Sequence, residues 1–337
     1  MTARRNRSHS VFPFPNVASQ RPNVGSANAF DLKSYISKLD TAFSFLTISS
    51  VFAGLTIACL LAVSFFLQGF YSFQAVLACF FLAVAVYNLN KLTDLQEDSV
   101  NVPERVRFVK RYYNYIITSV VVSFCASIVC AFLCNPYSIS AVVLGFCIGA
   151  LYSARLFGVR LKEIPLVKNV TVAGTCVVGA VLVPLAVHLS SLIAISLVAY
   201  FVFFTAFINT VLFDVRDLEG DQRSGTTTIP VSLGLNKTRG LLLVLNSTFV
   251  PWLLISSLQG LFHNFLTLLA CTTVYGYGCI LHFCKKDAKI RKTVDALVEG
   301  EWIVVALLVV LFAWPLTASV LHNDLLGPVA SVFGLSL

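Results

Sequence analysis

Residues Thr41–Asn90 read TAFSFLTISSVFAGLTIACLLAVSFFLQGFYSFQAVLACFFLAVAVYNLN and contain no Asp, Glu, Lys or Arg. A helix that crosses the hydrocarbon of a membrane needs about 20 apolar residues. The run is therefore long enough for two spans, and Gln68-Gly69 near its middle is a turn signal. The stretch predicts a helical hairpin, because the strands of a membrane barrel would alternate polar and apolar residues over about 10 positions.

Four further charge-free runs follow along the chain. Three have room for two spans and the last for one: Tyr112–Ala154, Asn169–Phe213, Gly240–Cys284 and Trp302–Asn323. Turn signals divide the long runs at Asn135-Pro136, His188–Ser191 and Gln259-Gly260. Four hairpins and one helix predict an all-α polytopic membrane protein with nine transmembrane helices in one bundle. The arrangement also suggests a four-helix internal duplication.

The composition agrees with a membrane protein. Hydrophobic residues make up 57% of the 337 residues and charged residues only 12%, too few charges to cover the surface of a soluble protein. The net charge of +8 raises the question of a nucleic-acid partner. All 24 Lys and Arg, however, lie outside the five runs and before the ninth span, hence on one side of the membrane. The positive-inside rule makes that side the cytoplasm, places the N-terminus there, and removes the reason to expect nucleic acid.

The chain divides into three parts on this pattern. Residues 1–40 have no hydrophobic segment of a signal peptide, and we expect a disordered cytosolic tail, with an organellar transit peptide as the alternative. Residues 41–323 form the membrane domain, and residues 324–337 form a short tail on the opposite side. The protein is expected to be an integral multi-pass protein of a prokaryotic plasma membrane, or of an organellar membrane if the tail is a transit peptide.

Two carboxylate clusters stand at the cytoplasmic ends of the second and sixth spans. The first is Asn90-Lys-Leu-Thr-Asp94-Leu-Gln-Glu-Asp98, and the second is Asp214-Val-Arg-Asp217-Leu-Glu-Gly-Asp221. On a helix each spacing places its three polar side chains on one face. Like charges at this spacing repel, and a bound cation would remove the repulsion. Oxygen ligands without nearby His or Cys suit Mg²⁺, which usually binds a few carboxylates plus substrate phosphates.

The two clusters resemble the aspartate-rich motifs of the UbiA-type intramembrane prenyltransferase superfamily, whose helix count also matches. The continuations Asn101-Val-Pro103-Glu-Arg105, Leu151-Tyr152-Ser153 and Arg160-Leu-Lys162 are similar to the family's loops, as is the segment from Glu219 to Gly234. The segments Arg105-Val-Arg-Phe-Val-Lys110 and Ala154-Arg155 depart from the family pattern where acceptor and diphosphate would be handled. The branch of the family therefore stays open.

The resemblance implies a prenyltransferase that moves a prenyl chain from a polyprenyl diphosphate to an acceptor after Mg²⁺-assisted loss of diphosphate. The acceptor implied is most often aromatic, as in lipoquinone biosynthesis. Two Mg²⁺ ions would be held by Asp94, Asp98, Asp214, Asp217 and Asp221. Asp94, Asp217 and Tyr152 would be catalytic, and the diphosphate would contact Asn90, Lys91, Arg105, Lys162 and Arg223.

Several alternatives remain at this point. Within the family the acceptor could be a glycerol-phosphate lipid or a tetrapyrrole, or the enzyme could be a cyclase or hydrolase without a separate acceptor. Outside it, a non-enzymatic membrane transporter is the main alternative, although transport usually leaves ionisable residues within the spans and the five runs have none. Membrane lipid is an expected partner, and the oligomeric state is open.

Overall fold

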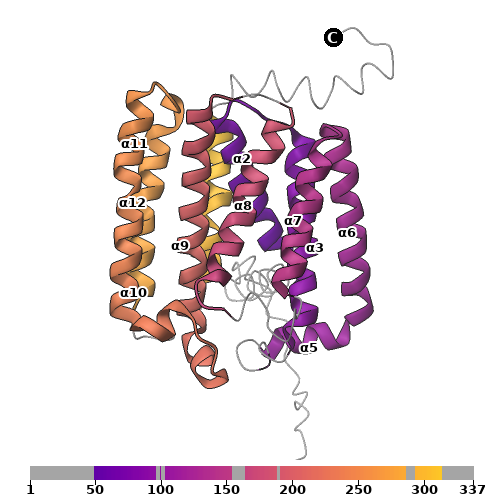
Figure 1. Cartoon of the computed structure of the whole chain (residues 1–337). Helices are drawn as coiled ribbons and strands as arrows, with labels where there is room; N and C mark the ends of the chain where they lie inside the picture. The colour runs from indigo at the N-terminus through magenta and orange to yellow at the C-terminus, as the bar shows by residue number, and fades with distance from the viewer. Residues whose placement is uncertain are drawn as a thin grey trace, which may run out of the picture. The chain divides into compact units, whose positions relative to one another are not determined.

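Helices make up most of the chain wherever the computed structural model describes it, which is residues 49–95, 99, 103–153, 164–187, 190–285 and 293–312 (Figure 1). These residues all belong to one unit, Phe43–Leu337. The predicted tails 1–40 and 324–337 lie outside the described residues. The helices are α2 (Val51–Leu67), α3 (Phe73–Thr93), α5 (Pro103–Arg111), α6 (Tyr113–Cys134), α7 (Ser138–Ser153), α8 (Val167–Leu185), α9 (Leu192–Ser224), α10 (Ile229–Ser247), α11 (Phe249–Leu258), α12 (Leu266–Phe283) and α14 (Glu301–Phe312).

Six segments of the described chain are long and apolar enough to cross a membrane: Phe73–Thr93, Tyr113–Cys134, Val167–Leu185, Leu192–Arg223, Ile229–Leu258 and His263–Phe283. The apolar helices α2 and α7 are shorter, and α14 begins where the ninth span is predicted. An all-helical, multi-pass membrane protein is thereby confirmed, and the number of nine spans stays a prediction.

The turns between these helices lie where the turn signals predict them. Gly69 and Gly260 have φ of +69° and +68°, the left-handed conformation that glycine adopts at no steric cost. Between α6 and α7, Asn135 Oδ1 accepts a hydrogen bond of 2.9 Å from the backbone N–H of Tyr137. The remaining signal, His188–Ser191, is only partly described, but α8 ends before it at Leu185 and α9 begins after it at Leu192.

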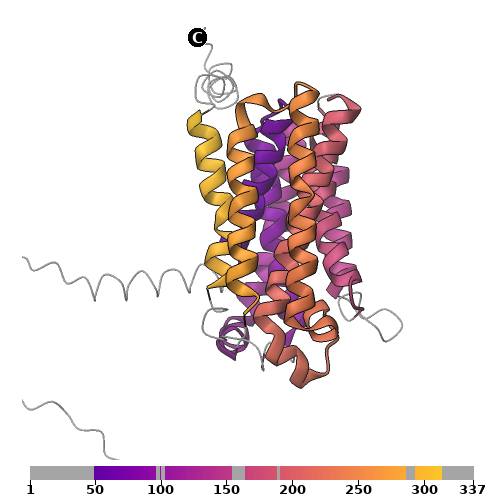
Figure 2. The same ribbon diagram turned by 90° about the vertical axis from the view of Figure 1, so that its left-hand side faces the viewer.

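The helices pack side by side, and α2 lies at the centre of the packing. Helix α2 contacts α3, α8, α9 and α14; α3 also contacts α6 and α7, and α9 also contacts α10 (Figures 1 and 2). The core is apolar and close-packed: Phe65, Val202, Leu242 and Ile280 are each fully buried. This arrangement brings the C-terminal ends of α3 and α9 to the same end of the bundle.

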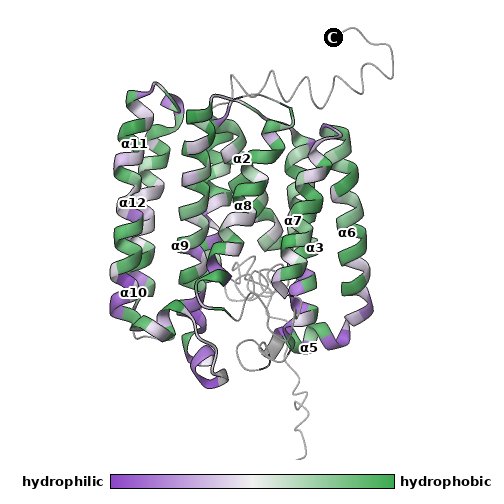
Figure 3. Cartoon of the chain, in the orientation of Figure 1, coloured by the Kyte–Doolittle hydropathy of each residue, from purple (hydrophilic) through white to green (hydrophobic). Residues whose placement is uncertain are grey.

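The outer surface of the bundle is apolar, as contact with lipid requires. Large side chains such as Val122, Leu133, Leu254 and Leu311 are each at least 56% exposed. Hydrophilic residues gather instead at one end of the bundle, which carries the end of α9, the start of α10 and α5 (Figure 3). The separation of charge that the sequence predicts is therefore present in three dimensions.

The two motif helices begin alike and end differently. Each starts with a serine whose hydroxyl accepts a backbone N–H three residues on, Ser72 for α3 and Ser191 for α9. Helix α9 then continues for 33 residues to Ser224, about 50 Å at 1.5 Å per residue, so it extends beyond a hydrocarbon core of about 30 Å. Helix α9 carries all three aspartates of the second motif, as predicted.

Helix α3 carries only the first residue of the first motif, Asn90. Helix α3 ends at Thr93, and Asp94 is its C-cap residue with φ −101° and ψ 12°. The backbone N–H of Asp94 still bonds to the carbonyl of Asn90, 2.9 Å away. Asp94 thus terminates the helix instead of continuing it, and Asp98 lies outside the described residues.

Candidate active site

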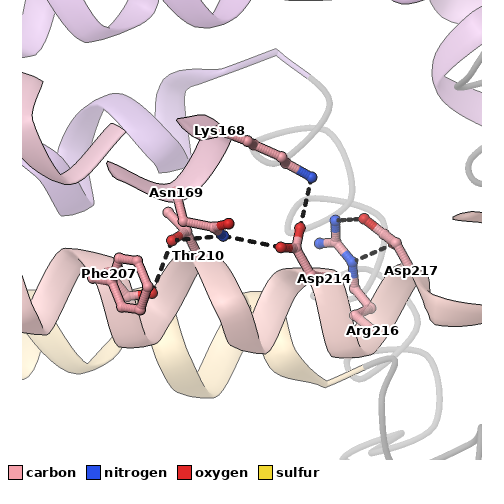
Figure 4. Close-up of polar contacts among 7 residues, drawn as sticks. All are labelled: Lys168, Asn169, Phe207, Thr210, Asp214, Arg216 and Asp217. Carbon is pink, nitrogen blue, oxygen red and sulfur yellow. Dashed lines mark hydrogen bonds and ion pairs between the residues drawn. The ribbon is translucent and has the colours of Figure 1, made fainter. Parts of the chain in front are cut away.

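Among the motif carboxylates that the structure describes, Asp214 is the most deeply buried, with 1% of its surface exposed. Its oxygens are held by the start of the neighbouring helix α8 (Figure 4). Lys168 Nζ lies 2.6 Å from Asp214 Oδ1, and Asn169 Nδ2 donates to Asp214 Oδ2 at 2.9 Å. Asn169 Nδ2 also lies 3.2 Å from Thr210 Oγ1, one turn earlier on α9. Two consecutive residues of α8 therefore set the direction of this carboxylate.

Asp217, one turn further along α9, is held by its neighbour Arg216. The guanidinium donates from Nε to Oδ1 at 2.9 Å and from Nη2 to Oδ2 at 2.8 Å (Figure 4). Bidentate pairs of this kind are among the strong charge-assisted hydrogen bonds. Both side chains remain about one-fifth exposed, 20% and 23%. The pair therefore stands at the surface of the site, where a ligand can reach it.

Asn90 and Asp94 of the first motif lie at the C-terminal end of α3. Asn90 Oδ1 accepts a hydrogen bond from the Ser153 hydroxyl at the end of α7, and Asp94 Oδ1 accepts one of 2.9 Å from Thr93 Oγ1. Lys91, only 6% exposed, donates to the hydroxyl of Ser50 before α2. Polar side chains of three helix ends are thus tied together around this motif.

One cavity of about 350 Å³ connects the two motifs. Its polar end is lined by Asn90, Lys91, Asp94, Arg105, Tyr152, Lys168, Asp214, Arg216 and Asp217. From there it continues between α2, α3, α7 and α8 along apolar side chains that include Leu61, Leu82, Val178 and Val183. The cavity therefore offers a charged head and a long apolar arm, which suit an amphiphilic ligand with an anionic head group.

The donor atoms at the polar end suit a hard divalent cation. Asp94, Asp214 and Asp217 contribute carboxylate oxygens to the wall, and such oxygens are the ligands that Mg²⁺ prefers. Within the described residues, however, no three His, Cys, Asp or Glu side chains gather as a ready-made metal site. Mg²⁺ is usually bound by one or two carboxylates plus substrate phosphates. The residues fit a cation that binds together with a phosphorylated ligand.

Not all predicted site residues line the cavity. Asp221 is buried on α9, two turns beyond Asp214, and Arg223 is exposed in the last turn of the same helix; neither is part of the cavity wall. Asp98 and Lys162 lie outside the described residues. The roles assigned to these four residues stay predictions.

Among the residues of the wall that sequence reasoning missed are Tyr87, Arg216 and Glu299. Arg216 stands between two aspartates of the second motif, so its place in the motif was visible. Tyr87 precedes Asn90 by one helical turn, which was a usable signal. Glu299 gave no signal, because it lies about 80 residues from the nearest motif and reaches the cavity only through the packing of the last helices.

Comparison with known proteins agrees with this fold. A model described as the UbiA prenyltransferase family matches residues 51–299. A solved UbiA homolog from Archaeoglobus fulgidus has a TM-score of 0.63 at 17% identity, over 80% of this chain and 98% of that one. The same homolog bound to GPP and Mg²⁺ has a TM-score of 0.59 at 18% identity, over 78% and 99%. An apo UbiA homolog from Aeropyrum pernix has a TM-score of 0.56 at 17% identity, over 75% and 98%. No curated protein matches the chain by sequence.

Proposed function

Because the chain belongs to the UbiA prenyltransferase family, we propose that it transfers a prenyl chain from a polyprenyl diphosphate to an aromatic acceptor with Mg²⁺. Prenyl transfer follows from the family; the metal, the donor and the acceptor are the proposal. The observation that carries this proposal is one cavity that has carboxylates of both motifs at its charged end and an apolar arm behind them. The A. fulgidus homolog bound to GPP and Mg²⁺ supports it by similarity of fold.

The diphosphate would lie at the charged end of the cavity. Arg105, Lys168 and Arg216 line that end and supply the positive charge that a diphosphate needs. Lys168 and Arg216 are held in place by their ion pairs with Asp214 and Asp217. The prenyl chain would extend into the apolar arm, since burial of its carbon surface is favourable there.

Mg²⁺, when bound, would neutralise the negative charge that grows on the diphosphate as it leaves. Asp94 and Asp217 would bind the Mg²⁺, and Asp214 would be the third carboxylate ligand. The allylic C–O bond breaks with its electron pair on the diphosphate, and the cationic carbon is attacked by a carbon of the acceptor ring, which then loses a proton. The ring of Tyr152 lines this end, and an aromatic face stabilises a nearby cation.

We also propose the predicted topology of nine spans with the N-terminus and the charged end of the cavity in the cytoplasm. Two observations support this arrangement. The described helices coincide with predicted spans, and hydrophilic residues gather at one end of the bundle. The diphosphate group of the donor would then enter the cavity from the aqueous side, and the prenyl chain of the donor would enter it from the membrane.

The experiment uses purified protein, Mg²⁺, a radiolabelled polyprenyl diphosphate and a panel of aromatic and glycerol-phosphate acceptors. We expect Asp94→Asn and Asp217→Asn each to reduce transfer at least 100-fold, because each removes a charged ligand; a chelator should stop the wild-type reaction and added Mg²⁺ should restore it. Glu219→Gln is the matched control, because Glu219 is exposed on α9 and lies outside the cavity wall. Undiminished transfer by either aspartate variant would contradict the metal assignment.

A further inference from the structure

Pro184 lies inside the last turn of α8 and leaves one backbone carbonyl of that helix without its usual partner. Proline has no N–H, so position 184 donates no hydrogen bond to the carbonyl of Ala180, four residues earlier. Ala180 is fully buried, with 0% of its surface exposed. Proline is tolerated in a membrane-spanning helix where a neighbouring helix satisfies the carbonyl that the proline has freed. The neighbours of Ala180 must therefore supply a donor.

Gln68, at the end of α2, is that donor. Its Nε2 lies 2.9 Å from the carbonyl oxygen of Ala180 and 3.0 Å from that of Ser64. The Ser64 carbonyl belongs to the last turn of α2, where helix carbonyls lack an intrahelical donor, because the backbone N–H of Gln68 bonds to Phe65 instead. The Gln68 side chain is buried, with 6% exposed. One amide group thus donates to two helices and links the end of α2 to α8.

The link between Gln68 and Ala180 lies at the end of the apolar arm. Val183 is the wall residue closest to the end of α8, and Ala180 stands between it and Gly179, which also lines the arm. On α2 the last wall residue is Leu61, and a Cβ at Gly179 would lie only 3.0 Å from Leu61 Cδ1. The two helices therefore meet closely at the end of the arm. Gln68, about two turns past Leu61, ties them together there.

We propose that Gln68 is a positioning residue that closes the end of the apolar arm and so limits the length of the prenyl chain that the enzyme transfers. The proposal rests on the function proposed above, in which the chain of the donor lies in this arm. Gln68 is not part of the cavity wall, and it acts through the backbone of α8, whose Gly179 and Val183 line the arm on both sides of the bonded carbonyl. From Lys168 to Val183 the helix rises about 22 Å, which sets the depth available to a chain. A much longer chain has to displace α8 from α2.

The test compares kcat/KM for geranyl, farnesyl, geranylgeranyl and solanesyl diphosphate, with the best acceptor of the panel described above. Wild-type protein should use solanesyl diphosphate, whose chain is far longer than the arm, at least about 10-fold less well than the best shorter donor. Gln68→Met keeps the length of the side chain and removes the donor group. It should raise kcat/KM for solanesyl diphosphate about 10-fold. The value for geranyl diphosphate should stay unchanged, because its chain is too short to reach the end of the arm.

A second substitution separates this role from a simple loss of stability. Gln68→Met should lower the midpoint of thermal unfolding by about 2–4 °C, because it leaves the buried Ala180 carbonyl unpaired. Pro184→Ala supplies an N–H that can bond to Ala180 within α8, so the double variant should recover most of this loss. Its altered donor preference should persist, since the link between α2 and α8 is still missing.

Gln259→Met is the matched control. Gln259 ends α11 before Gly260, as Gln68 ends α2 before Gly69, and both glycines have positive φ. Gln259 is exposed, however, and lies outside the cavity wall. Its substitution should change neither the donor preference nor the midpoint of thermal unfolding.

The outcomes separate this proposal from the one it rests on. A wild type that uses solanesyl diphosphate as well as geranylgeranyl diphosphate would contradict a closed arm. An unchanged donor preference in Gln68→Met, or an equal fall of kcat/KM for all donors, would show that Gln68 does not limit chain length. A double variant that regains the wild-type donor preference together with its stability would also overturn the proposal. A wild type that transfers no donor to any acceptor of the panel would instead contradict the proposed function.

Discussion

Lys168 and Asp214 form the interaction that ties the second motif to the rest of the bundle. The Asp214 side chain is almost fully buried, 1% exposed, and the Lys168 side chain is 29% exposed. Desolvation of the two charges opposes the Coulomb attraction between them, so the pair itself contributes little net stability. Removal of one partner, in contrast, leaves an uncompensated charge in a buried position.

Lys168→Met should therefore lower the stability of the protein by about 1–3 kcal/mol. Asp214→Asn added to Lys168→Met should recover part of this loss, because no buried charge then remains. Thermal unfolding of the three variants in detergent measures the effect as a double-mutant cycle. Strictly additive changes would mean that the two side chains do not depend on each other.

Residue chemistry and spacing, together with the family resemblance, predicted much of the polar wall. Asn90, Lys91, Asp94, Arg105, Tyr152, Asp214 and Asp217 all line the cavity. Asp221 belongs to the second motif and Arg223 follows it by two residues, but neither lines the cavity, because they stand one turn and nearly two turns beyond Asp217 on α9. Spacing along a helix gives the face of a side chain, and it does not tell where the neighbouring helices end.

Close approach between helices is what shapes the cavity at the scale of the elements. Helices α3 and α7 meet at Gly149, where a Cβ would lie 2.6 Å from Val86 Cγ1. Small residues at such contacts let helix backbones approach in a membrane, where the hydrophobic effect does not drive association. Gly174 on α8 has no atom within 4 Å of a Cβ position and makes no such contact.

Gly149→Ala should lower stability by about 1–3 kcal/mol, since overpacking forces α3 and α7 apart. Gly174→Ala should be neutral or stabilising by up to about 1 kcal/mol, because alanine favours a helix over glycine and meets no neighbour. The midpoint of thermal unfolding in detergent reports both. Equal effects of the two substitutions would contradict the packing argument.

The apolar arm sets how much of a prenyl chain can be buried. Val178 lines it and is half-buried on α8, 10 residues past Lys168, which is about 15 Å along the helix axis. Val178→Phe should raise the KM for long polyprenyl diphosphates and leave that for dimethylallyl diphosphate unchanged. Val170→Phe is the control, because Val170 is 41% exposed on the same helix and is outside the cavity wall. An equal effect of Val178→Phe on all chain lengths would exclude this role of the arm.

The whole molecule is organised by the separation of apolar spans from charged loops. A protease site inserted after Gly225, between α9 and α10, should lie on the cytoplasmic side, and one inserted after Gly260, before α12, on the opposite side. Both insertions fall in turns, where insertions are tolerated. In sealed inside-out vesicles a protease should cleave the first site and spare the second. Cleavage of both, or of the second alone, would contradict the proposed topology.

Hydropathy and turn signals were enough to predict the helices and the turns, because a bilayer admits few structures and each span carries its own signal. The side of the membrane stays a prediction. The same pattern does not tell that α3 ends at Thr93, between Asn90 and Asp94, since a helix end depends on what surrounds it. The ion pairs of Asp214 and Asp217, the course of the apolar arm and the arrival of Glu299 in the cavity depend on which helices pack together. Those contacts join residues far apart in the chain, and no local pattern records them.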